Sequence, residues 1–330
     1  MSRPSRLISR RDFLCTSAGI ALLPWGVTRR GRRSGGRRSR VVVVRTSDRR
    51  TGVAEALRLF DPAGIGGRRV VLKPNFNSAD AAPASTHPDT LGQLVTELHE
   101  RGARSVTLGE SSGPGGTRRV LEQLGVLDLA TPLRFDVVNF DELPDADWTP
   151  IDARGTHWPA GYHLPRLVTD AEYLVSTCCL KTHGYGGVFT MSLKLAVGLT
   201  PRPIRRSMHR SPDMRRMIAE LNAGYRPRLV VLDGVTAFTD GGPSSGERKD
   251  ANVMIAGDDR VAVDAVGLAV LKDLGANDAV MNRGIWAQEQ IARAVELNLG
   301  ARGPADIELV TGDAESRAYA GRLERILATG

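Results

Sequence analysis

Short apolar runs alternate along the chain with segments in which apolar residues recur at intervals of three and four. Runs of strand length occupy residues 41–45, 69–73 and 105–109, and segments with helical spacing follow the first two, at residues 51–60 and 88–101. A continuous apolar run is typical of a strand buried on both faces of a parallel sheet, and the wider spacing indicates an amphipathic helix. The first third of the chain therefore predicts successive strand-helix-strand units with right-handed crossovers.

The rest of the chain continues this alternation less regularly. We expect a strand at 135–140, an excursion from the sheet at 144–165, strands at 173–180, 228–233 and 253–256, helices starting near Val188, Ser211 and Asp258 or Asp259, a polar loop at 238–250, a helix at 285–299, and a closing strand and helix at 307–310 and 316–327. The predicted fold class is α/β, with a mostly parallel, doubly wound sheet and helices on both faces. Residues 41–315 would form this domain and residues 316–330 its C-terminal helix.

Residues 173–201 carry charge where a buried segment is not expected to hold it. Lys181 and His183 follow an apolar strand at i and i+2, so an extended chain places both on one face. A glycine-rich turn follows, and a helix starting near Val188 would hold Lys194 beside its apolar face. An ammonium beside apolar walls costs free energy unless an anion meets it, so the stretch predicts a carboxylate partner or an anionic ligand. The alternative is that both lysines extend to water.

Polar residues follow each predicted strand at its carboxyl end, where ligands bind in doubly wound sheets. Lysine supplies only five of the 45 basic residues, yet Lys73, Lys181 and Lys194 all lie in or beside these positions. Lysine in place of arginine favours a compact point charge or an amine that can lose its proton, although chance placement of five residues is the alternative. The predicted catalytic residues are His183, Lys181 and Asp264, and the predicted substrate-binding residues are Lys73, Asn75, Glu110, Ser111, Ser112, Gly113, Lys194, His209 and Asp233.

The loop that starts at Glu110 could cradle an anion. Its serine and glycine N–H groups precede a helix that Thr117 could cap, although a simple turn explains the same residues. The loop matches neither the dinucleotide-binding glycine pattern nor the P-loop, so the sequence does not predict nucleotide binding.

Histidines and carboxylates suggest a metal site only weakly. His183 and His209 could bind a metal together with Asp233, Asp240 or Asp264, but no H-x-x-x-H or comparable spacing supports this, so we predict no metal ligands. Asp264 lies on a predicted helix whose neighbouring residues face the core, which would bury it partly, opposite a lysine. A structural ion pair is the alternative.

The net charge of +8 is concentrated at the N-terminus. Residues 1–40 contain eleven arginines and one aspartate, a net charge of 11 − 1 = +10, which leaves 8 − 10 = −2 for the rest of the chain. Affinity for nucleic acids comes mainly from neutralising phosphates, so a body of nearly balanced charge predicts no nucleic-acid partner.

The N-terminal segment has the pattern of an export signal. Arg10 and Arg11 are followed by Asp12, Phe13 and Leu14, and then by an apolar run too short to span a membrane. This resembles a twin-arginine signal at residues 1–28, which implies the twin-arginine export machinery as a partner and a periplasmic or other extracytoplasmic location. No clear cleavage site follows, so the leader could be kept as a tether. Residues 29–40 predict a disordered basic linker that could contact anionic lipid.

The cysteines predict no cluster and no disulfide. Cys15 lies in the leader, and the other two, Cys178 and Cys179, are adjacent and would point to opposite faces of a strand. An iron-sulfur cluster needs about four ligands, so none is expected, and the sequence leaves open which cofactor, if any, the protein uses.

Several short motifs occur in one order along residues 40–315: K-P-N at Lys73, T-H-P at Thr86, E-S-S-G at Glu110, K-T-H at Lys181, then Lys194, His209, D-G, G-G-P and A-V-D-A. Together they resemble the bacterial and archaeal family called domain of unknown function 362. Two positions depart from the family pattern: Leu195 replaces an asparagine, and Glu110 replaces an aspartate. The resemblance implies a shared α/β fold and site. Some relatives carry an appended ferredoxin-like domain, whose cysteines this chain lacks, and the family name assigns no reaction.

These observations support two hypotheses. The first is an exported enzyme acting on a small anionic substrate, with Lys73, Lys181 and Lys194 binding phosphate or carboxylate and His183 as acid or base. In it, Asp233 and Asp264 orient these groups. The second is a non-catalytic extracytoplasmic binding protein that uses the same pocket for capture. A His183→Gln change separates them, because an enzyme should lose turnover and keep its ligand, whereas a binding protein should mainly lose affinity.

Overall fold

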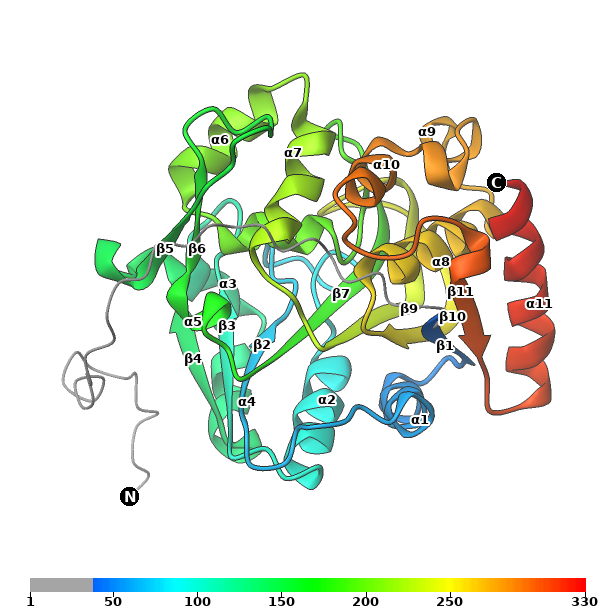
Figure 1. Ribbon diagram of the computed structural model, residues 1–330. Coiled ribbons are helices and arrows are strands. Elements are labelled where there is room, and N and C mark those ends of the chain that lie inside the picture. Colours follow the sequence, from blue (N-terminus) through cyan, green and yellow to red (C-terminus); the bar gives the residue numbers. More distant parts are fainter. Residues whose placement is uncertain (1–37) are drawn as a thin grey trace.

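The computed structural model describes residues 38–330, in which helices cover both faces of one large sheet (Figure 1). In spatial order its strands are β11 (Ile307–Val310), β1 (Ser39–Arg45), β10 (Gly246–Gly257), β9 (Leu229–Gly241), β7 (Tyr173–His183), β2 (Arg69–Lys73), β3 (Ser105–Glu110) and β4 (Phe135–Asn139). β10 is antiparallel to β1 and β9, and the other neighbours in this order are parallel. The predicted α/β class with a mostly parallel sheet is therefore confirmed.

The helices divide between the two faces. One face packs against α1 (Arg49–Phe60), α2 (Pro88–Glu100), α3 (Thr117–Gln123) and α4 (Val126–Leu133). The other packs against α5 (Arg166–Thr169), α6 (Arg202–Arg210), α7 (Met214–Leu221), α8 (Arg260–Asp273), α9 (Asp278–Met281), α10 (Glu289–Glu296) and α11 (Ala314–Thr329). The predicted excursion at 144–165 contains a separate two-stranded sheet, β5 (Trp148–Ile151) with β6 (Tyr162–Pro165). Short 3-10 helices are η1 (Phe140–Glu142), η2 (Asp145–Asp147), η3 (Lys194–Leu199), η4 (Asn222–Gly224), η5 (Ile285–Ala287) and η6 (Pro304–Asp306).

The strand β1 shows why continuous apolar runs form the centre of this sheet. Successive side chains point to opposite faces, so Val41 and Val43 join the core beneath α8, while Val42 and Val44 join the core beneath α1. All four are almost fully buried. Burying one valine contributes roughly 1.5–3 kcal/mol, so each face of the sheet needs its own apolar residues.

The chain crosses to opposite faces after two neighbouring strands. From β2 it returns to β3 through α2, and from β7 it returns to β9 through α6 and α7 on the other face. β2 and β7 are parallel and adjacent, with Lys73 opposite Ser176. A reversal of strand order between adjacent parallel strands opens a crevice at their carboxyl ends, and this is the usual ligand position in such folds.

The prediction of a helix starting near Val188 is wrong. β7 continues through Lys181 to His183, the chain turns, and β8 (Val188–Thr190) pairs back antiparallel on β7, with His183 opposite Val188. The helix that follows is only the short η3, which begins at Lys194. The glycine-rich turn allows the reversal, and backbone pairing with β7 then replaces the helical hydrogen bonds.

The prediction of a polar loop at 238–250 is also wrong. β9 and β10 both extend into it as an antiparallel hairpin, with Phe238 opposite Arg248 and Asp240 opposite Glu247. A projecting hairpin is held by backbone hydrogen bonds, so its side chains can be polar.

Three further elements differ from the prediction. The arginine-rich helix α6 was not predicted, and the helix expected at 285–299 is divided into η5 and the shorter α10. β1 begins at Ser39, inside the predicted linker, because it pairs with β11 and Ser39 Oγ donates to Asp259 (2.6 Å).

The predicted export signal at 1–28 and the rest of that linker lie outside the described residues. No helix between residue 38 and residue 330 is long and apolar enough to cross a membrane.

Candidate functional site

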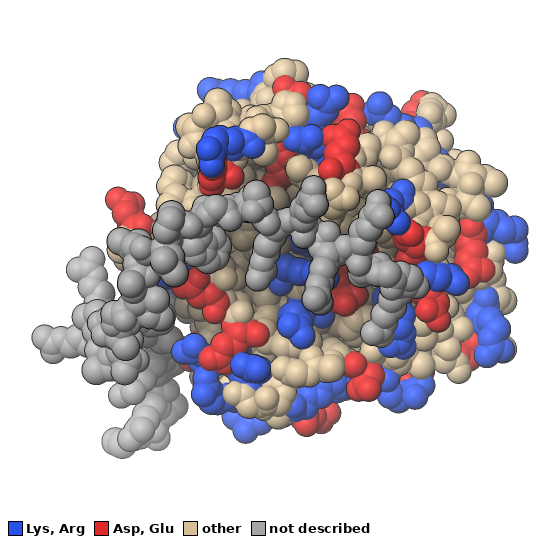
Figure 2. All heavy atoms as spheres, in the orientation of Figure 1, with Lys and Arg blue, Asp and Glu red and all other residues tan. Residues whose placement is uncertain are grey.

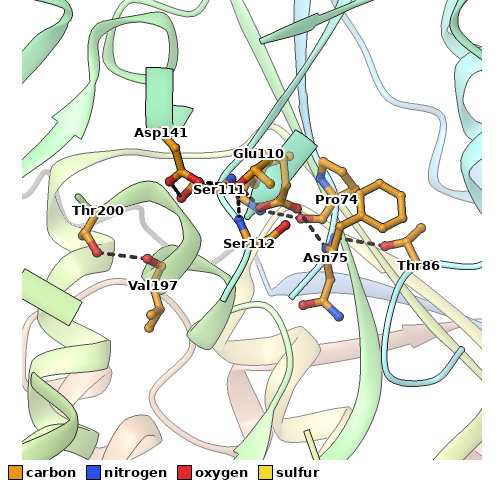
Figure 3. A network of polar contacts seen from close by, with 12 residues as sticks. Pro74, Asn75, Thr86, Glu110, Ser111, Ser112, Asp141, Val197 and Thr200 are labelled. Carbon is orange, nitrogen blue, oxygen red and sulfur yellow. Dashed lines mark hydrogen bonds and ion pairs between the residues drawn. The ribbon is translucent and has the colours of Figure 1, made fainter. Parts of the chain in front are cut away.

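A buried ion pair joins the carboxyl ends of β2 and β3. Lys73 Nζ donates to Glu110 Oε1 (2.6 Å) and to Pro74 O (2.6 Å), and both charged side chains are buried. Glu110 also accepts from the backbone N–H groups of Ser111 (2.8 Å) and Phe76 (2.9 Å). Burial lowers the pKa of Lys73, and the Glu110 charge opposes that shift. Figure 3 shows Glu110 between the Pro74–Asn75 segment and the serine loop, so the pair holds two site segments together.

The first three N–H groups after Glu110 bond within the protein. Ser112 N donates to Thr117 Oγ1 (2.8 Å), Gly113 N donates to Asn77 O (2.8 Å), and Ser111 N is taken by the carboxylate described above. Thr117 is the first residue of α3 rather than its cap. Ser111, Ser112 and Gly113 therefore offer no free N–H group to a ligand, and the predicted cradle would depend on the N–H groups from Gly115 onward. The Ser112 hydroxyl is buried and has no hydrogen-bond partner within residues 38–330.

Arg205 on α6, which the sequence analysis missed, binds this loop. Its Nη1 donates to the carbonyls of Ser111 (3.1 Å) and Ser112 (3.0 Å), and its Nε donates to Thr200 O (2.7 Å). Burial lowers the pKa of Arg205 to about 10. The one sequence signal is that Arg205 lies three residues before Met208, the other buried residue of this helix.

Lys181, a predicted catalytic residue on β7, forms hydrogen bonds with two loops. It is fully buried, and its Nζ donates to Ala84 O (2.5 Å) and Pro243 O (3.2 Å). Asn75 supports the same segment, because its Nδ2 donates to Ala84 O (3.0 Å) and its N–H donates to Thr86 Oγ1 (2.9 Å), as Figure 3 shows for Thr86. Burial lowers the pKa of Lys181. Its hydrogen bonds make it mainly a structural cation.

His183 is held as a neutral hydrogen-bond donor. Its Nδ1 accepts from the Gly187 N–H (3.2 Å), so the ring proton must lie on Nε2. Burial, reinforced by the charge of Lys194, lowers the pKa of His183 to about 2. A general base would need a free lone pair and a pKa nearer neutrality. This geometry favours a donor role, in which the Nε2–H donates to a ligand oxygen, and the acid or base role stays a prediction.

Lys194, at the start of η3, is the cation without a partner. It is 8% exposed, and no acceptor or carboxylate lies within bonding distance of its Nζ among the residues that the structure describes. Burial lowers the pKa of Lys194 to about 7, and the positive charges of Lys181 and Arg205 add to this shift. A buried ammonium surrounded by other cations loses its proton easily, so this amine is partly neutral at neutral pH.

Two glycines show how closely η3 packs into the site. A β-carbon on Gly187 would lie 2.8 Å from His183 Nδ1 and 3.1 Å from Lys194 Cε. A β-carbon on Gly198 would lie 3.1 Å from Lys73 Nζ. The short helix therefore lies between the His183 turn and the Lys73 ion pair, and both glycines are required by these close approaches.

His209 at the end of α6 is fixed in the opposite tautomer to His183. Its Nδ1 lies 2.7 Å from Arg205 O, and since a carbonyl can only accept, Nδ1 carries the proton and Nε2 keeps its lone pair. Burial is the first cause of its lowered pKa, and the charge of Lys194 adds to it. His209 is an exposed residue that can accept a proton at Nε2.

Asp264 holds the backbone before η3. The sequence analysis predicted a lysine opposite this carboxyl, and the structure of residues 38–330 places none there. Asp264 is fully buried, and its carboxyl accepts from Ser192 N (2.8 Å), Ser192 Oγ (2.5 Å) and Leu193 N (2.9 Å). Burial raises its pKa to about 6, against these hydrogen bonds. α8 points this carboxyl at the backbone before η3, so its contacts there are with N–H and hydroxyl groups.

Asp233 lies in a separate network. Its carboxylate accepts from Arg49 Nε (2.9 Å), Thr90 Oγ1 (2.6 Å) and Val235 N (3.1 Å), which joins α1 and α2 to β9. Asp233 therefore lies apart from the site, whereas Asp264 supports the backbone directly before Lys194. The structure gathers the other predicted residues with Arg205 at the same sheet edge: Lys73, Asn75, Glu110, Ser111, Ser112, Gly113, Lys181, His183, Lys194 and His209. Within residues 38–330, no three His, Cys, Asp or Glu side chains are grouped as metal ligands.

Comparison with known proteins identifies relatives of this chain. The sequence profile described as "Domain of unknown function (DUF362)" matches residues 70–269. Thylakoid-associated protein sll1697 of Synechocystis sp. is 26% identical over 239 residues, which cover 67% of this chain and 70% of that protein. The lactate racemase apoprotein of Thermoanaerobacterium thermosaccharolyticum is 14% identical, with a TM-score of 0.42 over 87% of this chain and 86% of that one. A score this low transfers no site or activity.

Proposed function

This chain belongs to the domain of unknown function 362 family, and we propose that it is an enzyme whose substrate is a small anion bearing a carboxylate or phosphate group. The substrate would bind at the carboxyl ends of β2 and β7. The observation that carries this proposal is the Lys194 amine, on a residue that is only 8% exposed, with no hydrogen bond or ion pair to other residues of the described range 38–330.

The charges around Lys194 favour an anionic ligand. Lys73 is neutralised by Glu110, but Lys181, Lys194 and Arg205 have no carboxylate within salt-bridge distance among residues 38–330. Isolated buried charges are costly, and a bound anion would offset that cost. Figure 2 shows acidic and basic side chains interspersed over one face, so the visible surface there carries no large patch of one charge.

The neighbouring titratable groups favour an enzyme over a binding protein. A capture site needs only donors and charges, whereas this region also holds an amine with a pKa of about 7, and a nearby helix carries an imidazole with a free lone pair. Strongly shifted pKa values in a ligand crevice are typical of catalytic sites.

Citrate or inorganic phosphate should raise the melting temperature of the wild-type protein. At a hundred times its dissociation constant, a ligand adds about 2.7 kcal/mol to the free energy of unfolding. Lys194→Met should abolish most of this response, because the site loses its unpaired cation. Lys249→Met is the matched control, since Lys249 lies on the β9–β10 hairpin and its side chain is 38% exposed. An equal response in wild type and Lys194→Met would contradict the proposed site.

We also propose that the protein is exported. The twin-arginine pattern at Arg10 and Arg11 supports this, and the Synechocystis relative is named as thylakoid-associated. Replacing both arginines by lysine should abolish export and leave a folded protein in the cytoplasm, because the receptor reads the arginine pair and the fold does not depend on it. Cell fractionation with immunoblotting measures the result. Export of the double variant at the wild-type level would show that the segment is no such signal.

A further inference from the structure

The groups around Lys194 have their proton positions fixed by backbone contacts. His183 accepts the Gly187 N–H at Nδ1 and so presents Nε2–H, while His209 faces a backbone carbonyl with Nδ1 and so presents a bare Nε2. Lys194 Nζ has no acceptor among the residues described. The site therefore combines one donor, one proton acceptor and one free amine, which is more than the binding of an anion requires.

His183 and Lys194 lie side by side, and His209 is an exposed residue near the end of α6. Lys194 Cε and the His183 ring both pack against Gly187. A β-carbon added to this glycine would lie 3.1 Å from Lys194 Cε and 2.8 Å from His183 Nδ1. The charge of Lys194 lowers the pKa of both histidines. The charged and titratable groups that face the amine are Lys181 and His183 from β7, and Arg205 and His209 from α6. None of these is a carboxylate, so nothing in this set holds the amine as an ammonium.

We propose that Lys194 is the reacting group, and that its neutral amine adds to the carbonyl carbon of a small oxo acid to form an imine. This inference rests on the proposed function, because the carboxylate of the oxo acid is the anion that the site would bind. His183 would donate its Nε2–H to the carbonyl oxygen, and His209 would move the protons. Lys181 and Arg205, which have no carboxylate partner within residues 38–330, would supply the positive field for the carboxylate.

The step balances without an oxidant or a second substrate. The Lys194 ammonium gives one proton to His209 Nε2, and the amine lone pair then forms a bond to the carbonyl carbon. The π electron pair moves to the oxygen, which accepts the hydrogen bond from His183. A second proton passes from nitrogen to that oxygen and gives a neutral carbinolamine. His209 returns the first proton to the hydroxyl, water leaves, and the product is a protonated imine.

The surroundings of the amine suit this chemistry. A lysine acts as a nucleophile only when neutral, and desolvation beside other cations is an established way to achieve this. The pKa of about 7 leaves a substantial neutral fraction at physiological pH. Among the five lysines, Lys73 and Lys181 hold hydrogen bonds to Glu110 and to backbone carbonyls, and Lys249 and Lys272 also bond to backbone carbonyls. Lys194 is the one with a free amine in the described structure.

Borohydride trapping tests the proposal. The folded wild-type protein is incubated with pyruvate or glyoxylate and sodium cyanoborohydride, and intact mass spectrometry followed by peptide mapping locates the reduced adduct. We expect one adduct, on Lys194, forming faster as the pH rises through about 7. Lys194→Arg should form none and keep most of the thermal stabilisation by pyruvate, since it keeps the charge. His183→Ala should slow trapping by roughly 10²-fold, as expected for loss of a donor to a developing oxyanion.

The controls separate this inference from the proposed function. Lys249→Met should trap like the wild type. If pyruvate and lactate stabilise the protein equally and no adduct forms, or if the adduct maps to another lysine, the imine proposal is overturned and anion binding stands. If neither acid nor phosphate nor citrate changes the wild-type melting temperature, the proposed function itself fails.

Discussion

Replacing Glu110 by alanine should lower the free energy of unfolding by about 3–5 kcal/mol, the usual cost of leaving one member of a buried ion pair without its partner. Lys73 Nζ would lose its bond to Glu110 Oε1, and the N–H groups of Ser111 and Phe76 would lose their acceptor. Urea denaturation measured by circular dichroism provides the value. Glu55→Ala is the control, because the Glu55–Arg58 pair is solvent-accessible and should contribute no more than about 1 kcal/mol.

A double variant identifies the source of the loss. Removing Lys73 as well, by Lys73→Met, takes away the unpaired charge but leaves the two backbone N–H groups without an acceptor. Glu110→Ala with Lys73→Met should therefore be more stable than Glu110→Ala alone and less stable than the wild type. If the double variant loses the sum of the two single losses, the two side chains do not interact, and the ion pair does not stabilise the site.

Replacing Asp264 by alanine should cost a similar amount, about 3–5 kcal/mol, and should weaken the response to anions. The buried N–H groups of Ser192 and Leu193 would lose their acceptor, and each unsatisfied buried group costs about 1–3 kcal/mol. Lys194 begins the next turn, so its amine would lose its fixed position. Unfolding in urea and melting with citrate measure the two effects. Asp258→Ala, at an exposed position, should change stability by less than about 0.5 kcal/mol.

The pH dependence of Asp264 gives an independent check. Its folded pKa of about 6 is above the ordinary value of 3.8, so the neutral carboxyl is favoured in the folded state. Its contribution to stability is complete below pH 3.8 and is lost as the pH rises through 6. Asp264→Asn does not titrate, so the stability of the wild type relative to this variant should fall by about 3 kcal/mol between pH 4 and pH 7. A relative stability that rises over this range would contradict the assignment.

The apolar pattern was sufficient to predict the architecture. Strands buried on both faces need continuous apolar residues, and this places β1, β2 and β3 within one or two residues of their predicted bounds. Parallel strands end at one edge, so the charged residues at the ends of β2 and β3, Lys73 and Glu110, could be assigned to a common site. These conclusions depend on local composition and on a geometric rule, and both can be read from the chain.

Contacts between distant segments decided the rest, because side-chain roles depend on partners that the sequence does not place. Lys181 and Lys194 look alike in the sequence, but Lys181 binds the carbonyl of Ala84, 97 positions away, whereas Lys194 has no acceptor in the described protein. Asp264 faces the backbone before η3 because β8 folds back on β7, a reversal that removed the predicted helix. Arg205 reaches the serine loop from 94 positions away. Local sequence determined which residues are buried or charged, and tertiary packing determined which charges remained without a partner.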